Sequence, residues 1–102
     1  MTTISSVQFR VAPGKNQEAT AYLKKVTAHL KSVTGSDSRI FTRLAGPNGQ
    51  MMVASTWDNV AAWDAARQKQ VSDAAFQKMA ADAGTAGIWV PGSIETAVWE
   101  EL

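Results

Sequence analysis

The amino-acid sequence predicts an α+β fold in which four strands form one antiparallel sheet and helices cover one of its faces. The first observation is that an alternating apolar-polar stretch, 6–11, leads through a Pro-Gly turn into a helical pattern at 16–34. The second is that the same order recurs, because the alternating stretch 52–57 runs directly into another helical segment. The third is that the stretch 39–44 is separated from 52–57 by turn residues at 46–49, as in a hairpin.

The first half of the chain contributes one strand and one long helix. Residues 4–11 alternate, and the side chains expected to face the helices are Val7, Phe9 and Val11. Asn16 is expected to cap the helix, and Glu18 lies favourably in its first turn. Gly35 is a natural C-terminal stop. The expected buried stripe of this helix consists of Ala19, Tyr22, Leu23, Val26, Leu30 and Val33.

The second half contributes a helical region that we expect to be interrupted, followed by a last strand. Asp58 is expected to cap the second helix. Ser72 and Asp73 resemble a second cap, so a kink or break is expected near 70–71. The alternation at 93–100 predicts the final strand. After the break, the residues expected to face inward are Ala75, Phe76, Met79, Ala80 and Ala83, and those expected to end the helix are Gly84 and Gly87.

The order strand, helix, strand, strand, helix, strand is the split β-α-β, or ferredoxin-like, arrangement (β-α-β-β-α-β). Helices cover one face of such a four-stranded antiparallel sheet, so the other face is bare. The apolar side chains expected there are Ile4, Phe41 or Ile40, Met52 or Val53, and Trp99. An exposed apolar patch of this size normally marks an interface, and we therefore expect a homodimer that forms through the sheet faces.

Length and composition exclude several classes of function. A chain of 102 residues predicts a single domain at 1–102. The net charge of +1 and the 19% content of charged residues indicate no basic stripe, so no nucleic-acid partner is expected. No apolar run approaches the roughly 20 residues of a membrane span, and the N-terminal residues lack a signal pattern, so we expect a cytoplasmic protein with no membrane partner. The absence of cysteine excludes disulfides and thiolate sites, and a single histidine, His29, argues against a multi-histidine metal site.

The stretch 54–59, Ala-Ser-Thr-Trp-Asp-Asn, enters a helix and is followed downstream by Ser72, Asp73 and Phe76. This pattern resembles the dimeric alpha-beta barrel superfamily, including its antibiotic-biosynthesis monooxygenase-like branch, over almost the whole chain. The resemblance implies two ferredoxin-like protomers that pack their sheets face to face. It also implies a small pocket in each protomer between the sheet and its helices.

Five residues are candidates for a functional site. Trp57 matches the superfamily's pocket-lining strand tryptophan, which implies stacking on a flat aromatic substrate; the alternative is an ordinary core position. Asn59, Trp63 and Arg67 share one helix face at four-residue spacing, where Asn59 would bind a carbonyl and Arg67 an enolate or carboxylate. In the alternative, Asn59 only caps the helix and Arg67 only covers Trp63 in a cation–π contact. Imidazole suits acid–base catalysis near neutral pH, so His29 is the candidate base, unless it is a structural residue at the core boundary.

The resemblance implies a cofactor-independent monooxygenase that acts on a small aromatic or polyketide-like substrate, with no metal or organic cofactor. In that branch the substrate becomes an enolate that reacts with dioxygen, while the protein supplies desolvation and hydrogen bonds. Trp57, Asn59 and Trp63 would bind the substrate, Arg67 would stabilise the oxyanion and His29 would be the base. Haem-degrading relatives use a histidine on the second helix, and the matching stretch 67–70 holds none. The alternatives are a non-catalytic dimer that binds a metabolite or a partner protein, and an interaction protein that uses a sheet edge or the loop at 88–92.

Overall fold

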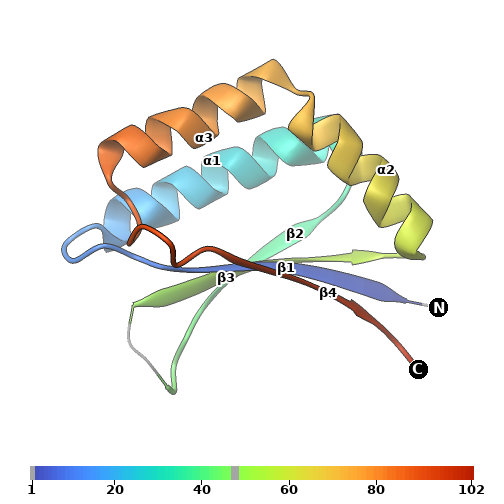
Figure 1. Cartoon of the computed structure of the whole chain (residues 1–102), viewed down its shortest axis with the longest axis horizontal. Coiled ribbons are helices and arrows are strands. Elements are labelled where there is room, and N and C mark those ends of the chain that lie inside the picture. The colour runs from blue at the N-terminus through green and yellow to red at the C-terminus, as the bar shows by residue number, and fades with distance from the viewer. Residues whose placement is uncertain (1, 47–48) are drawn as a thin grey trace.

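The structure is a computed structural model that describes residues 2–46 and 49–102, and its strands form one four-stranded sheet of order β2-β3-β1-β4. All neighbouring strands are antiparallel (Figure 1). The predicted α+β, ferredoxin-like class is therefore confirmed. In chain order the elements are β1 Thr3–Arg10, α1 Asn16–Thr34, β2 Ser38–Thr42, β3 Gln50–Trp57, α2 Val60–Val71, α3 Ala74–Ala86 and β4 Glu95–Glu100.

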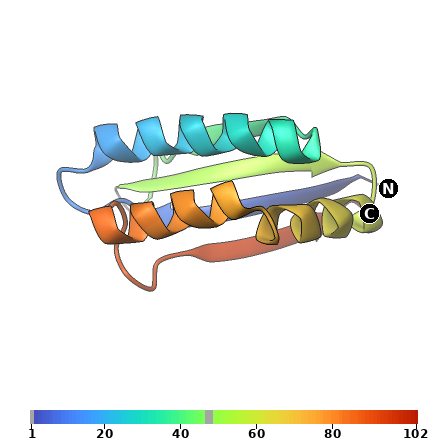
Figure 2. The same cartoon turned by 90° about the horizontal axis from the view of Figure 1, so that it is seen from above.

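The three helices lie on one side of the sheet, and α2 and α3 follow one another in a row beside α1 (Figures 1 and 2). The predicted break is confirmed, because α2 ends at Val71 and a new helix begins at Ala74. Asp73 caps this second helix, since its Oδ2 accepts a hydrogen bond of 2.8 Å from the amide of Phe76. Within the described chain, none of the helices combines the length and the apolar character that a membrane crossing needs.

The hydrophobic core is concentrated toward the end of the sheet where Phe9 lies. Trp89 packs against Phe9 and Tyr22, with ring centroids 4.7 Å and 5.1 Å apart. Toward the start of β1 the helix-facing residues change to hydroxyl side chains, Ser5 and then Thr3. Apolar packing therefore stabilises one end of the protein, while a polar surface lies beneath the helices at the other. The buried members of the core are Phe9, Val11, Ala19, Leu23, Val26, Ala83 and Ile88.

Several predicted helix ends are wrong by one or a few residues. Asn16 is the first residue of α1 and not its cap; Lys15 stands at the cap position without a side-chain hydrogen bond. Asp58 does not cap α2, because the next residue, Asn59, adopts an extended backbone and its Oδ1 accepts from the amide of Ala62 at 2.8 Å. Gly84 lies inside α3, which continues to the left-handed Gly87.

Other differences concern burial and strand ends. Phe76 and Met79 are partly buried as predicted, but Ala75 and Ala80 are exposed, because α3 contacts the rest of the protein along a narrower stripe. The strand β2 stops at Thr42, and the side chain of Leu44 beyond it is fully exposed. The predicted turn residues Pro47 and Asn48 lie outside the described residues, as does Met1.

The face of the sheet opposite the helices carries the predicted apolar side chains. The strand register places Ile4 beside Trp99 and Met52 beside Phe41 on this face, which we call the open sheet face. Ile40 and Val53, the two alternatives, pair with each other on the helix side. Ile4 is 43% exposed, Phe41 44% and Trp99 65%, so the open sheet face exposes large apolar side chains in a single chain. The strand register places polar residues such as Gln8, Arg39 and Glu95 on the same face.

Candidate ligand-binding cavity

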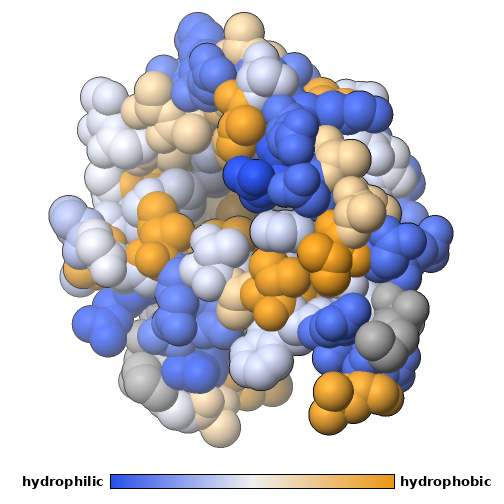
Figure 3. All heavy atoms as spheres, turned by 45° about the vertical axis from the view of Figure 1, so that its right-hand side comes forward, coloured by the Kyte–Doolittle hydropathy of each residue, from blue (hydrophilic) through white to orange (hydrophobic). Residues whose placement is uncertain are grey.

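A cavity of about 250 Å³ lies between the sheet, the C-terminal part of α1 and one side of α2. Its walls combine apolar, aromatic and hydroxyl side chains. The side of the molecule that carries α2 and both termini shows hydrophobic side chains exposed among polar ones (Figure 3). The residues that line the cavity are Ser5, Ser6, Val7, Leu30, Thr34, Ser36, Ser38, Val53, Ser55, Trp57, Trp63, Arg67, Gln70 and Thr96.

The interruption of the helical layer explains why this part of the sheet is not filled. Val7 lies on the central strand β1 and faces the helices, a position that is normally buried, yet it is 36% exposed. Gln70, at the end of α2, lines the cavity above it. Because α2 ends at Val71 and slopes away from the axis of α3, the helical layer is interrupted here (Figure 1).

The floor of the cavity is a row of serines from three adjacent strands. The strand register places Ser5 opposite Ser55, and Ser55 opposite Ser38. The hydroxyls of Ser38 and Ser55 share a hydrogen bond of 2.7 Å. The indole Nε1 of Trp57 donates to the hydroxyl of Ser5 at 2.9 Å, which holds the ring against this row. Hydroxyls both donate and accept, so the floor can bind either a carbonyl or an anionic oxygen.

Arg67 provides the positive charge at the cavity. Its Nη2 donates to Oδ1 of Asp64 at 2.9 Å, and its guanidinium carbon lies 5.6 Å from the ring centroid of Trp63. The hydrogen bond from Arg67, with a further one from Gln68, lowers the pKa of Asp64 below its ordinary value. About half of the Arg67 side chain is exposed, so the guanidinium lies at the border between the cavity and solvent.

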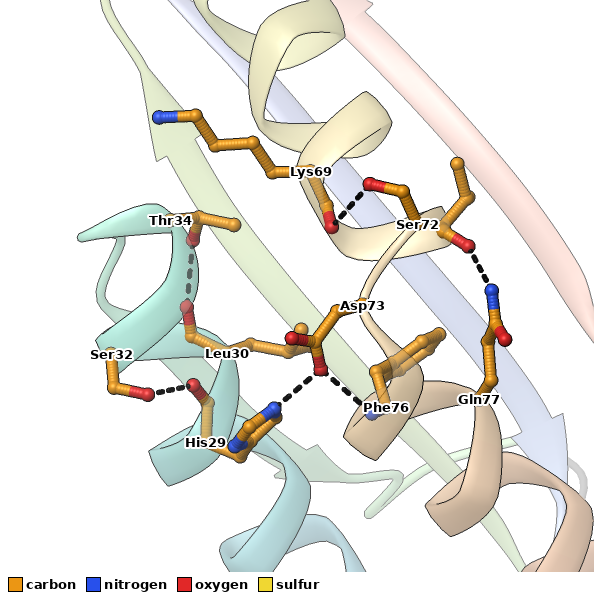
Figure 4. A network of polar contacts seen from close by, with 10 residues as sticks. His29, Leu30, Ser32, Thr34, Lys69, Ser72, Asp73, Phe76 and Gln77 are labelled. Atoms are coloured by element: carbon orange, nitrogen blue, oxygen red, sulfur yellow. Dashed lines mark hydrogen bonds and ion pairs between the residues drawn. The ribbon is translucent and has the colours of Figure 1, made fainter.

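His29 and Asn59, two of the five candidate residues, are held by other contacts. His29 Nε2 and Asp73 Oδ2 are 2.6 Å apart, an interaction that joins α1 to the start of α3 (Figure 4). Asn59 uses its side-chain oxygen to cap α2. Neither is among the residues that line the cavity, whereas Trp57, Trp63 and Arg67 are. The catalytic and binding roles of all five residues remain predictions.

The candidate residues named from sequence did not include the serines or the two acidic partners. Ser5, Ser38 and Ser55 occupy strand positions whose side chains face the helices, where the alternation favours apolar residues. The sequence signal that could have identified the serine row was the presence of three hydroxyl side chains on the helix-facing side of neighbouring strands. No comparable signal showed that Asp64 contacts Arg67 or that Asp73 contacts His29. Both contacts depend on the three-dimensional placement of the side chains.

The chemistry of the cavity is that of binding and of stabilising negative charge. Two indoles present flat surfaces, hydroxyls and the Gln70 amide supply hydrogen bonds, and Arg67 supplies a cation. Among the described residues that line it, there is neither a carboxylate nor an imidazole. Within 2–46 and 49–102, no cluster of three or more acidic or histidine side chains is placed to hold one metal ion.

Comparison with solved structures shows proteins of the same fold. A NIPSNAP family protein from Agrobacterium tumefaciens aligns over 100% of this chain and 94% of its own, with a TM-score of 0.79 and 15% identity. A NIPSNAP domain protein from Burkholderia xenovorans, described as uncharacterised, aligns over 98% and 94%, with a TM-score of 0.79 and 13% identity.

A candidate antibiotic biosynthesis monooxygenase from Deinococcus radiodurans aligns over 98% of this chain and 92% of its own, with a TM-score of 0.72 and 12% identity. Comparisons with protein-family models and with curated proteins found no match. These neighbours confirm the ferredoxin-like fold that the resemblance implies for the single chain. Identities this low carry no activity from one protein to another.

The contact between His29 and Asp73 predicts a specific pH dependence of stability. The hydrogen bond from His29, and secondly that from the amide of Phe76, lowers the pKa of Asp73 below its ordinary value of 3.8. A carboxylate whose pKa is lowered on folding stabilises the protein above its unfolded pKa, and this contribution is lost as pH falls through the folded pKa. In urea unfolding followed by circular dichroism, Asp73→Asn should therefore be less stable than wild type at pH 5, and the difference should shrink steadily below pH 4.

The matched control for this prediction is Asp82→Asn. Asp82 lies on the same helix, and its exposed carboxylate meets Lys78 at 3.3 Å. We expect this variant to differ little from wild type at either pH, because exposed ion pairs contribute little to stability. A difference between wild type and Asp73→Asn that stays constant from pH 5 to pH 2 would contradict the assigned role of Asp73.

Proposed function

We propose that the protein binds a small, flat aromatic molecule that carries an acidic oxygen, in the cavity between the sheet and α2. The observation that carries the proposal is the convergence of two indoles, one guanidinium and a row of serine hydroxyls on one cavity. Aromatic walls suit a planar ring, and the guanidinium suits a carboxylate, phenolate or enolate.

The size of the cavity restricts the ligand. Pockets for drug-sized ligands usually measure about 300–1,000 Å³, so a cavity of about 250 Å³ suits a molecule of one or two rings. Its walls also explain the expected orientation. The ring would lie between Trp57 and Trp63, and its acidic oxygen would point toward Arg67 at the border with solvent.

The contact with Asp64 supports a binding role for Arg67. A guanidinium carries five N–H donors in a fixed fork, and the contact with Asp64 engages one terminal nitrogen. Asp64 and the Trp63 ring hold the fork in one position before a ligand arrives. Such preorganisation reduces the conformational entropy that binding would otherwise lose.

This proposal predicts that Arg67→Gln weakens the binding of 2-naphthoate, a two-ring carboxylate, by about tenfold or more. Hydrogen bonds to charged groups contribute about 1.5–3 kcal/mol, which corresponds to at least tenfold in affinity. Isothermal titration calorimetry measures the change. Lys78→Gln is the matched control, because it removes one positive charge on α3, away from the cavity, and should leave the affinity unchanged. Equal affinities for the Arg67→Gln variant and wild type would contradict the proposed orientation.

A second candidate function is cofactor-independent oxidation of such a ligand by dioxygen. It is favoured by the donors at the cavity, Arg67 and the hydroxyl floor, which could stabilise an enolate, and by the fold shared with a candidate monooxygenase. His29, the candidate base, is not placed to take a proton from a ligand in the cavity. Its side chain is bound to Asp73 and does not line the cavity. Oxidation would therefore require a substrate that ionises readily once its anion is bound by Arg67.

1-Naphthol tests this second candidate, because it has two rings and its naphtholate anion is electron-rich at the ring carbon opposite the oxygen. One 1-naphthol and one dioxygen give one 1,4-naphthoquinone and one water, so dissolved-oxygen consumption follows the reaction. An enzyme should accelerate oxygen uptake above the protein-free rate, and Arg67→Gln should lower this acceleration by about a hundredfold or more, in line with removal of one oxyanion donor. Binding of 2-naphthoate without any acceleration would favour the non-catalytic alternative.

We also propose a homodimer that forms through the open sheet face. Ile4, Phe41 and Trp99 are exposed together there, although apolar side chains of this size are usually covered. Analytical ultracentrifugation should find a dimer for wild type and a monomer for Trp99→Lys. Leu44→Lys is the control, since Leu44 is equally apolar and 96% exposed but lies on a loop beyond β2, and this variant should remain a dimer. A monomeric wild-type protein would contradict the dimer proposal.

A further inference from the structure

A second hollow of about 300 Å³ adjoins the cavity, and Thr34, Ser36 and Trp57 line both spaces. We call it the outer hollow. The two spaces lie on different sides of α2, because Trp63 and Arg67 line the cavity while the neighbouring positions on the helix line the outer hollow. The α2 residues on that second side are Ala62, Ala65, Ala66 and Lys69. Trp57, at the end of β3, is therefore one of three residues at which the two spaces meet.

Two hydroxyl residues of β1, Ser5 and Thr3, are neighbours of Trp57 across the strand pair. The indole Nε1 of Trp57 donates to Ser5 at 2.9 Å, and Ser5 lines the cavity. Thr3 lies directly opposite Trp57 in the strand register and is fully buried. Within 2–46 and 49–102, its hydroxyl oxygen has no hydrogen-bond partner. A buried hydroxyl without a partner is destabilising and rare, so it requires an explanation.

We infer that Trp57 is a movable partition that sets the length of the ligand. Its indole N–H bonds to Ser5 in the closed position seen here and to Thr3 in an open position. Directly opposite residues on antiparallel strands have Cβ atoms about 4.5–5.5 Å apart, so the Thr3 hydroxyl lies within reach of the ring after a rotation. Because Ser5 lines the cavity and Thr3 does not, a shift from Ser5 to Thr3 withdraws the ring and joins the cavity to the outer hollow.

This inference rests on the proposed function and extends its substrate class. A two-ring aromatic acid fits the closed position, whereas a linear three-ring acid requires the open one. Only a small fraction of protein molecules is in the open position when no ligand is bound. The apparent affinity for the longer ligand therefore equals its intrinsic affinity for the open position multiplied by this fraction. Removing the acceptor of the closed position raises that fraction, and removing the acceptor of the open position lowers it.

The test compares 2-naphthoate with 2-anthroate, which is one fused ring longer, by isothermal titration calorimetry. The measured quantity is the ratio of the two dissociation constants. Ser5→Ala should shift this ratio in favour of 2-anthroate by about fivefold, the size expected for one hydrogen bond. Thr3→Val should shift it several-fold in the opposite direction. It should leave the fold intact, because it replaces an unpartnered buried hydroxyl by a methyl group of similar shape.

Ser32→Ala is the matched control, since Ser32 is also a serine but its hydroxyl bonds to the His29 carbonyl and it lines neither space. Its ratio should equal that of wild type. Binding of 2-naphthoate with the same ratio in Ser5→Ala, Thr3→Val and Ser32→Ala would overturn the partition and leave the proposed function standing. Binding of neither probe by any of these proteins would overturn both.

Discussion

The interruption of the helical layer at Asp73 is the constraint on which the rest of the structure depends. One oxygen of the Asp73 carboxylate accepts a hydrogen bond from the Phe76 amide in the first turn of α3. The same oxygen contacts the side chain of His29 on α1. The Asp73 side chain therefore lies at the break between α2 and α3 and holds the start of α3 against α1 (Figure 4). Because the two helices do not form one continuous rod, part of the sheet around Val7 stays uncovered. The cavity adjoins this interruption, because Gln70 at the end of α2 is one of its lining residues.

The chemistry of the cavity follows from a change of residue type along the strands. Where the helix-facing residues are apolar, as at Phe9, the protein has its core. Where they are serines, as at Ser5 and Ser55, apolar helix packing would bury hydroxyls without compensation unless they bond to one another or to a ligand. The pairs Ser38–Ser55 and Ser5–Trp57 provide part of that compensation within the chain. A ligand with oxygen atoms would provide more of it.

The sequence predicted the elements of the fold more reliably than the contacts of the site. Alternation and helical spacing are local, so the order of elements along the chain, the break before Asp73 and the large apolar side chains on the open sheet face followed from them. Helix caps depend on the backbone angles of single residues, and for this reason Asn59, and not Asp58, caps α2. The helical spacing of Trp63 and Arg67 placed them correctly on one face of α2. The pairing of His29 with Asp73 spans 44 residues, and no local pattern contained it.

The comparison with solved structures identifies the fold of the protein but not its activity. NIPSNAP proteins and a candidate monooxygenase share the arrangement at 12–15% identity, so the function must be argued from the residues of this cavity. The most direct measurement is a crystal structure of the wild-type protein with 2-naphthoate. We expect the ring between Trp57 and Trp63, with its carboxylate within hydrogen-bond distance of Arg67. A cavity closed by the tryptophans, with the ligand absent or bound to the open sheet face, would contradict the account.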